Sequence, residues 1–96
     1  MGEMNTEVHI RLAQVLADFA NGESDHFVGG ATVGEVLAEL GTIHPGLGLM
    51  LWDDRGDLNA MMAAFLNGVN VKDLGWMQTP VHNGDELMVI SALEGG

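Results

Sequence analysis

The stretch Ala31-Thr32-Val33-Gly34-Glu35-Val36-Leu37 carries the clearest fold signal in this sequence of 96 residues. Thr32 is a favourable N-cap for a helix, and Glu35, three residues later, is the reciprocal partner of a capping box. After the cap, apolar residues recur at helical spacing, at Val33, Val36, Leu37 and Leu40. Gly41 follows them where a left-handed C-cap belongs. The pattern predicts a helix over residues 33–40, extending at most to residue 44.

Alternating apolar residues predict a strand on the N-terminal side of this helix. Val8, Ile10 and Leu12 lie on one face of residues 7–12, and His9 and Arg11 lie on the other, which is typical of a half-buried strand. The dipeptide at residues 21–22, Asn-Gly, marks a turn. We therefore expect a short second strand at about residues 24–28, paired back on the first as a hairpin.

Two further apolar segments predict strands after the helix. Residues 61–66 form a strand-like run that ends at Asn67-Gly68, a dipeptide typical of tight hairpin turns, and a short return strand follows over residues 69–71. After a turn at Asn83-Gly84, residues 87–90 are apolar at four consecutive positions. Such a run predicts a central strand covered on both faces. Its expected neighbour is the first strand, paired in parallel.

Residues 45–60 are expected to be irregular, because Pro45, Gly46 and Gly48 interrupt them and residues 53–57 read as an exposed acidic turn. The order of elements predicts an α+β fold, a mixed sheet of four to five strands with one main helix packed on one face. We expect one domain over residues 7–92, a disordered start over residues 1–6 and a flexible tail over residues 93–96.

The composition excludes several classes of partner. The chain has 14 acidic residues against 3 basic ones, a formal net charge of −11. This charge repels nucleic acid and anionic membranes, and it favours a basic protein surface as partner. The chain has no cysteine, which excludes disulfides and thiolate metal sites and fits a reducing, cytoplasmic location. We expect no secretory signal, and no apolar run approaches the roughly 20 residues that a membrane-spanning helix needs.

No metal site is expected from the sequence. The four histidines show no ligand spacing and fall in different predicted elements: His9, His26, His44 and His82. The acidic turn with Asp53, Asp54 and Asp57 lacks the spacing of a recognised calcium loop, so a solvated turn is the better interpretation. Trp52 and Trp76 lie near turns, where their rings either cap the core or face a partner.

Five segments, in this order and at this spacing, resemble those of a known family. They are residues 31–37, His44-Pro45-Gly46, Phe65-Leu66-Asn67-Gly68, Asn83-Gly84-Asp85-Glu86 and the terminal Gly95-Gly96. From about Val8 to Gly96 the chain resembles the MoaD/ThiS family of sulfur carriers, which have the ubiquitin-like β-grasp fold. That family includes the small subunit of molybdopterin synthase and the thiamine-pathway sulfur carrier.

The resemblance implies a carrier protein that is not an enzyme by itself and binds no cofactor. An E1-like adenylyltransferase would consume ATP to adenylate the carboxylate of Gly96, and a sulfur donor would then displace AMP to leave a thiocarboxylate. The thiocarboxylate would supply sulfur to a pathway enzyme in molybdopterin, thiamine or cysteine biosynthesis. Gly95 would serve as hinge and spacer, since glycine lets the backbone approach a narrow active site closely.

The resemblance also implies which residues bind the partner. Leu93 and Glu94 would lie in the channel of the partner enzyme, at positions where family members often carry prolines and small residues. Ile90 would lie either on a partner-facing surface of the sheet or in the core beneath the last strand.

Two other functions are compatible with the same resemblance. One is a ubiquitin-like modifier joined to lysines through Gly96, and the other is a noncovalent β-grasp interaction module. The carrier and the modifier share the adenylation step, whereas a noncovalent module would tolerate truncation of the tail.

Overall fold

The computed structural model describes residues 6–92, which form a five-stranded mixed sheet. The strands are β1 (Glu7–Leu12), β2 (Asp25–Gly29), β3 (Met62–Leu66), β4 (Val69–Asn70) and β5 (Glu86–Ser91). Their order is β2-β1-β5-β3-β4. β5 is central and pairs in parallel with β1 and antiparallel with β3, and each outer pair is an antiparallel hairpin. The predicted α+β architecture is confirmed.

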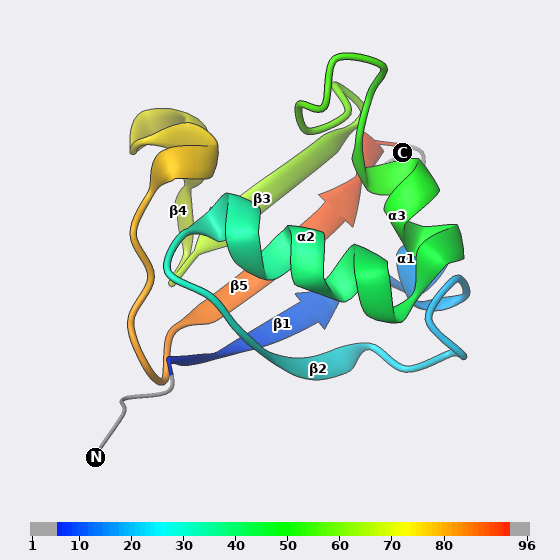
Figure 1. Cartoon of the computed structure of the whole chain (residues 1–96), viewed down its shortest axis with the longest axis horizontal. Helices are drawn as coiled ribbons and strands as arrows, with labels where there is room; N and C mark the ends of the chain where they lie inside the picture. Colours follow the sequence, from blue (N-terminus) through cyan, green and yellow to red (C-terminus); the bar gives the residue numbers. More distant parts are fainter. Residues whose placement is uncertain (1–5, 93–96) are drawn as a thin grey trace.

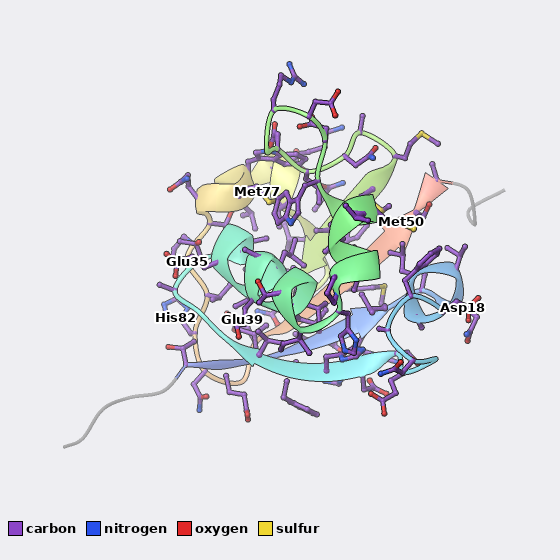
Figure 2. The ribbon with its side chains drawn as sticks, turned by 45° about the vertical axis from the view of Figure 1, so that its right-hand side comes forward. Asp18, Glu35, Glu39, Met50, Met77 and His82 are labelled. Atoms are coloured by element: carbon purple, nitrogen blue, oxygen red, sulfur yellow. The ribbon has the colours of Figure 1, made fainter. Side chains whose placement is uncertain are left out.

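The main helix, α2 (Val33–Ile43), lies across one face of the sheet (Figure 1). Thr32 Oγ1 accepts a hydrogen bond from Glu35 N at 3.2 Å, and the Glu35 carboxylate accepts one from Ala31 N at 2.9 Å. This reciprocal capping starts the helix where the sequence predicts it. Its apolar positions are buried, whereas Glu35 and Glu39 lie on the outward side (Figure 2).

A second helix, α3 (Pro45–Leu51), occupies the first part of the segment that the sequence predicts to be irregular, so that prediction is wrong there. Pro45 stands in the first turn, where its missing backbone N–H leaves no helical bond unmade. Leu47 and Leu51, four residues apart, are fully buried and fix the helix on the core. Tertiary packing therefore outweighs the low helix propensity of the two glycines in this segment.

Gly41 lies inside α2 and is not its C-cap, because the helix continues to Ile43. A Cβ atom added at Gly48 would lie 2.9 Å from Gly41 O, and one added at Gly41 would lie 3.0 Å from Gly48 Cα. The two glycines thus let α2 and α3 touch through their backbones. The position that the sequence assigns to a cap serves helix packing instead.

Three short helical segments complete the described chain: α1 (Gln14–Ala17), η1 (Val71–Asp73) and η2 (Trp76–Gln78). The sequence predicts none of them. α1 buries Leu16 and Ala17, which accounts for the loosely spaced apolar residues that follow β1. Nothing helical within residues 6–92 combines the length and the apolar character needed to cross a membrane.

α2 and α3 cover one face of the sheet (Figure 1). Successive side chains of a strand point to opposite faces, so the exposed and half-buried ones that alternate with the core residues lie on the other face, here called the open face. Along β5, Leu87, Val89 and Ser91 are buried, but Met88 is 40% exposed and Ile90 is half-buried. The prediction that this strand is covered on both faces is therefore wrong. Its four apolar residues belong to two surfaces, the core and the open face.

Candidate functional site

The chain leaves the sheet at the end of β5, beside the loop that precedes β3. Ala92 N donates a hydrogen bond to Met61 O at 2.7 Å and so holds the last described residue against that loop. The predicted reacting residues Gly95 and Gly96 and the predicted channel residues Leu93 and Glu94 lie outside the described residues. Their roles stay predictions.

Ile90 is the one predicted site residue that lies within the described part of the chain. It is half-buried on the open face, where it pairs with Ala63 of β3. Its neighbour on the same face, Met88, pairs with Phe65 of β3 and with Arg11 of β1. Of the two placements that the sequence leaves open, the structure supports the sheet surface, and contact between Ile90 and a partner stays a prediction.

An apolar band crosses the open face toward the start of the tail. We define it by five half-buried or exposed side chains: Met61, Ala63, Phe65, Met88 and Ile90. Its two methionines are 45% and 40% exposed. Flexible thioether side chains adapt to the shape of a bound surface, and a contiguous exposed apolar patch marks a site of protein interaction. The apolar band is therefore suited to docking another protein.

A polar cluster occupies the part of the open face formed by β1 and β2. The His9 ring stacks on the Phe27 ring with centroids 4.7 Å apart, and His9 Nε2 lies 2.8 Å from Asp25 Oδ1. Arg11 lies between two carboxylates, 3.6 Å from Asp25 and 3.5 Å from Glu86. These contacts order the side chains around the Phe27 ring, which is 62% exposed and accessible to a partner.

A groove of about 740 Å³, here called the exit groove, lies where the apolar band meets the tail. Its lining comes from three separate segments and includes Arg55, Ala63, Lys72, Trp76, Ile90 and Ala92. Two of these residues are basic, although the whole sequence has only three lysines and arginines. The structure thus concentrates the rare positive charges of the chain beside the point at which the tail begins.

Trp76 adopts an uncommon backbone conformation in the wall of the exit groove. Its φ is +56°, in the left-handed region that favours glycine, and its indole Nε1 donates to Asp57 Oδ1 at 2.8 Å. Thr79 Oγ1 accepts from Gly75 N and donates to Trp76 O, at 2.9 and 2.7 Å. These bonds hold the ring where it both packs partly on the core and lines the groove.

The acidic turn is a hydrogen-bonded loop built on Asp53. Asp53 Oδ1 accepts from Asp57 N and from Arg55 N, each at 2.9 Å, and the bond from Asp57 N is the main reason that the pKa of Asp53 lies below its ordinary value. Within residues 6–92, no group of three or more His, Cys, Asp or Glu side chains is placed to hold a metal ion. The carboxylates of this turn instead shape one wall of the exit groove.

Sequence reasoning misses the meeting of Arg55, Lys72 and Trp76, because they come from separate segments that only the folded chain brings together. The sequence did contain one indication that Lys72 is unusual, because it is the single lysine of a strongly acidic chain. The four histidines fall in separate parts of the fold, as expected, although two of their rings are in contact. The rings of His26 and His44 meet edge to face, with centroids 5.2 Å apart.

Comparison with protein families gives a match over nearly the whole chain. A family model described as the ThiS family matches residues 10–96. Comparison with curated proteins gives no match.

Solved structures of similar shape cover nearly all of the chain. Small archaeal modifier protein 1 from Methanosarcina acetivorans gives a TM-score of 0.83 at 24% identity, over 98% of this chain and 100% of that chain. A chain of the BexX/CysO complex from Amycolatopsis orientalis gives 0.83 at 26% identity, over 93% and 99%. SAMP1 from Haloferax volcanii gives 0.81 at 28% identity, over 94% and 99%. These matches confirm the ubiquitin-like β-grasp fold.

Proposed function

This chain belongs to the ThiS family, and on that premise we propose that it is a sulfur-carrier protein. An E1-like adenylyltransferase activates the Gly96 carboxylate, which becomes a thiocarboxylate and delivers sulfur for the biosynthesis of molybdopterin, thiamine or cysteine. The chain catalyses no step by itself, and it serves either as a free carrier or as the small subunit of a synthase such as molybdopterin synthase. Its need for ATP and reduced sulfur assigns it to the cytoplasm.

The proposed reaction has two steps, both catalysed by the partner enzyme. A carboxylate oxygen of Gly96 attacks the α-phosphorus of ATP, and pyrophosphate leaves. Hydrosulfide then attacks the carbonyl carbon, so that a C–S bond forms, the C–O bond to AMP breaks, and the proton of the sulfur passes to solvent. Gly95 and Gly96 suit this role because a residue without Cβ lets the backbone lie close to a nucleotide.

The observation that best supports the proposal is that the tail begins beside the apolar band. Ile90 belongs to that band, and Ala92, two residues later, is held against the 52–61 loop by its bond to Met61 O. An enzyme docked on the open face therefore meets the tail at its first residue, and Leu93 and Glu94 enter its channel. Binding away from the reacting carboxylate then positions that carboxylate for chemistry.

A second candidate function is protein modification. The observation that favours it is the 28% identity to a solved structure described as SAMP1, a name that stands for small archaeal modifier protein 1. Both functions begin with the adenylate of Gly96 and differ in the nucleophile that attacks it. A lysine amine in place of hydrosulfide gives an isopeptide bond to another protein.

The experiment that tests the proposal is intact mass spectrometry of the chain after incubation with ATP, a sulfide source and the E1-like enzyme of the same organism. We expect a mass gain equal to the exchange of one oxygen for one sulfur, located at Gly96 by fragmentation. Deletion of Gly96, or addition of one alanine after it, is expected to abolish the gain and to leave the circular dichroism spectrum unchanged.

Two results would contradict the proposal. One is an unchanged mass of the wild-type chain when the same enzyme preparation thiocarboxylates another carrier. The other is full activation of the variant without Gly96. Conjugates with cellular proteins that form at the expense of thiocarboxylate would instead support the modifier role.

A further inference from the structure

The exit groove contains a cation that has no ionic partner in the described part of the chain. Lys72, on η1, is exposed and forms no ion pair with any residue between 6 and 92. The other two basic residues are already paired: Arg11 with Asp25 and Glu86, and Arg55 with Asp53 at 3.4 Å. Among the lysine and arginine side chains of residues 6–92, Lys72 is thus the one left available to a partner, in a chain with a net charge of −11.

The carboxylates that line the same groove already accept hydrogen bonds from other groups of the chain. Asp53 accepts hydrogen bonds from two backbone N–H groups and contacts the guanidinium of Arg55. Asp57 Oδ1 accepts from Leu58 N at 2.9 Å and from the Trp76 indole at 2.8 Å. These two carboxylates are therefore already bonded and shape the groove. The ammonium of Lys72 is the charged group of the groove that has no ionic partner within residues 6–92.

The rest of the groove, apart from Asn70, is lined by apolar and aromatic side chains and is held in shape. Ala63 and Ile90 come from the paired strands β3 and β5, and the bond from Trp76 to Asp57 fixes the facing wall. A site whose walls are set before binding loses little conformational freedom when it is filled. The groove therefore presents a preformed apolar recess with one cation at its border.

We propose that the exit groove receives an apolar side chain of the activating enzyme that is followed closely by a carboxylate, with Lys72 pairing with that carboxylate. This inference rests on the proposed function. The chain carries a net charge of −11 and attracts basic groups overall, so a pair of the opposite polarity at the groove fixes the register of docking. Lys72 and Ala92 line the same groove, so docking there directs the tail into the enzyme.

The affinity of the chain for the E1-like enzyme without ATP tests the inference. We expect Lys72→Gln to weaken binding about fivefold, the size of an exposed ion pair, and Lys72→Glu to weaken it about tenfold, because like charges then meet. Lys72→Arg keeps the charge and is expected to retain wild-type affinity. The matched control is Leu49→Glu, which changes the net charge as Lys72→Gln does at a site on α3 that is 84% exposed and outside the groove lining. It is expected to leave affinity unchanged.

Two further measurements test the ion pair of Lys72 and the apolar contact in the groove separately. The chain has one lysine, so acetylation by an amine-reactive ester, assigned to Lys72 by peptide mapping and thereby distinguished from acetylation of the N-terminal amine, reports on this side chain. The enzyme is expected to protect it. Ala63→Leu fills the apolar recess and is expected to weaken binding without loss of the folded state. An unprotected lysine in the complex overturns the ion pair, and unchanged binding by Ala63→Leu overturns the apolar contact.

The outcomes also separate this inference from the proposed function. If Lys72→Glu binds the enzyme as tightly as the wild-type chain, or more tightly, while both become thiocarboxylated, only the groove assignment is overturned. If the wild-type chain neither binds the enzyme nor gains sulfur, both are overturned. Weakened binding by Lys72→Glu, with thiocarboxylate formation restored at saturating enzyme, supports both.

Discussion

Asn67 Nδ2 donates a hydrogen bond of 3.1 Å to Asp85 Oδ1, which joins two turns that lie 18 residues apart in the sequence. Asn67 also exchanges hydrogen bonds with the backbone of Glu86, the first residue of β5. Asp85 Oδ2 in turn accepts from His82 N at 2.7 Å. The two Asn-Gly turns are therefore locked together where β5 enters the sheet, and they set the register of the strand that carries the tail.

The first prediction concerns this connection. Asn67→Gly tolerates the φ of +50° at this position but leaves Glu86 N and Asp85 without their side-chain partner. We expect a loss of about 1–2 kcal/mol in the free energy of unfolding, measured by urea denaturation. Combined with Asp85→Ala in a double-mutant cycle, the effects are expected to be non-additive. Simple additivity would mean that the two turns are not coupled.

The second prediction concerns acid stability. Burial pushes the pKa of Asp85 upward, but hydrogen bonds from Asn67 and His82 N and the nearby His82 charge outweigh it, so the pKa lies below its ordinary value. The unfolded chain then binds this proton more tightly than the folded one. The resulting stabilisation is present above about pH 4 and declines as the pH falls through the lower pKa of the folded state.

The test is the free energy of unfolding measured across this range for the wild type and for Asp85→Asn. The variant has no carboxyl to protonate at residue 85, so its stability is expected to decline less steeply below about pH 4. Identical slopes for both proteins would show that Asp85 does not contribute to the acid response.

The third prediction concerns the contact between α2 and α3. Helix propensity alone predicts that Gly48→Ala stabilises the chain by up to about 1 kcal/mol. We expect the opposite, because the new Cβ would lie 2.9 Å from Gly41 O and would push the helices apart. Gly46→Ala, in the same helix, meets only Phe19 Cδ1 at 3.8 Å and is the matched control. A melting temperature raised by both substitutions would contradict this account.

The fourth prediction concerns docking on the open face. Met88→Glu places a charge in the apolar band on a side chain that is 40% exposed and outside the core. We expect the KM for the carrier in the adenylation reaction to rise about tenfold, as for a buried contact residue of an interface, while the melting temperature stays within a few degrees. If KM is unchanged, the enzyme approaches the chain from another side.

The main helix and the strands were predictable where the sequence pattern involves only residues close together in the chain. The Thr32–Glu35 capping box and the alternation over residues 7–12 depend on neighbours a few residues away, and the structure has both. α3 was not predictable in this way, since Pro45, Gly46 and Gly48 interrupt its sequence and the helix is held by the burial of Leu47 and Leu51. Gly41 looked like a cap because its contact partner, Gly48, belongs to the next helix.

The candidate site was predictable only in part, for the same reason. The role of the tail rests on the resemblance to a family and stays a prediction, because residues 93–96 lie outside the described part of the chain. The sequence correctly places Ile90 in the last strand. The face to which Ile90 points could not be assigned, because apolar residues occupy both sides of β5. The exit groove depends on Lys72 and Trp76 lining the same space as Ile90 of β5, which requires the complete tertiary structure.

The central position of β5 makes folding itself depend on the strand that precedes the tail. The hairpins β1–β2 and β3–β4 do not pair with each other, because β5 lies between them and pairs with β1 on one side and β3 on the other. Until the ribosome has released Glu86 to Ser91, each hairpin exposes an unpaired edge of the kind that leads to aggregation. Pairing of β1 with β5 spans almost the whole chain and is expected to be slow. A chain truncated before β5 therefore lacks the assembled sheet, and with it the open face on which we propose that an activating enzyme docks.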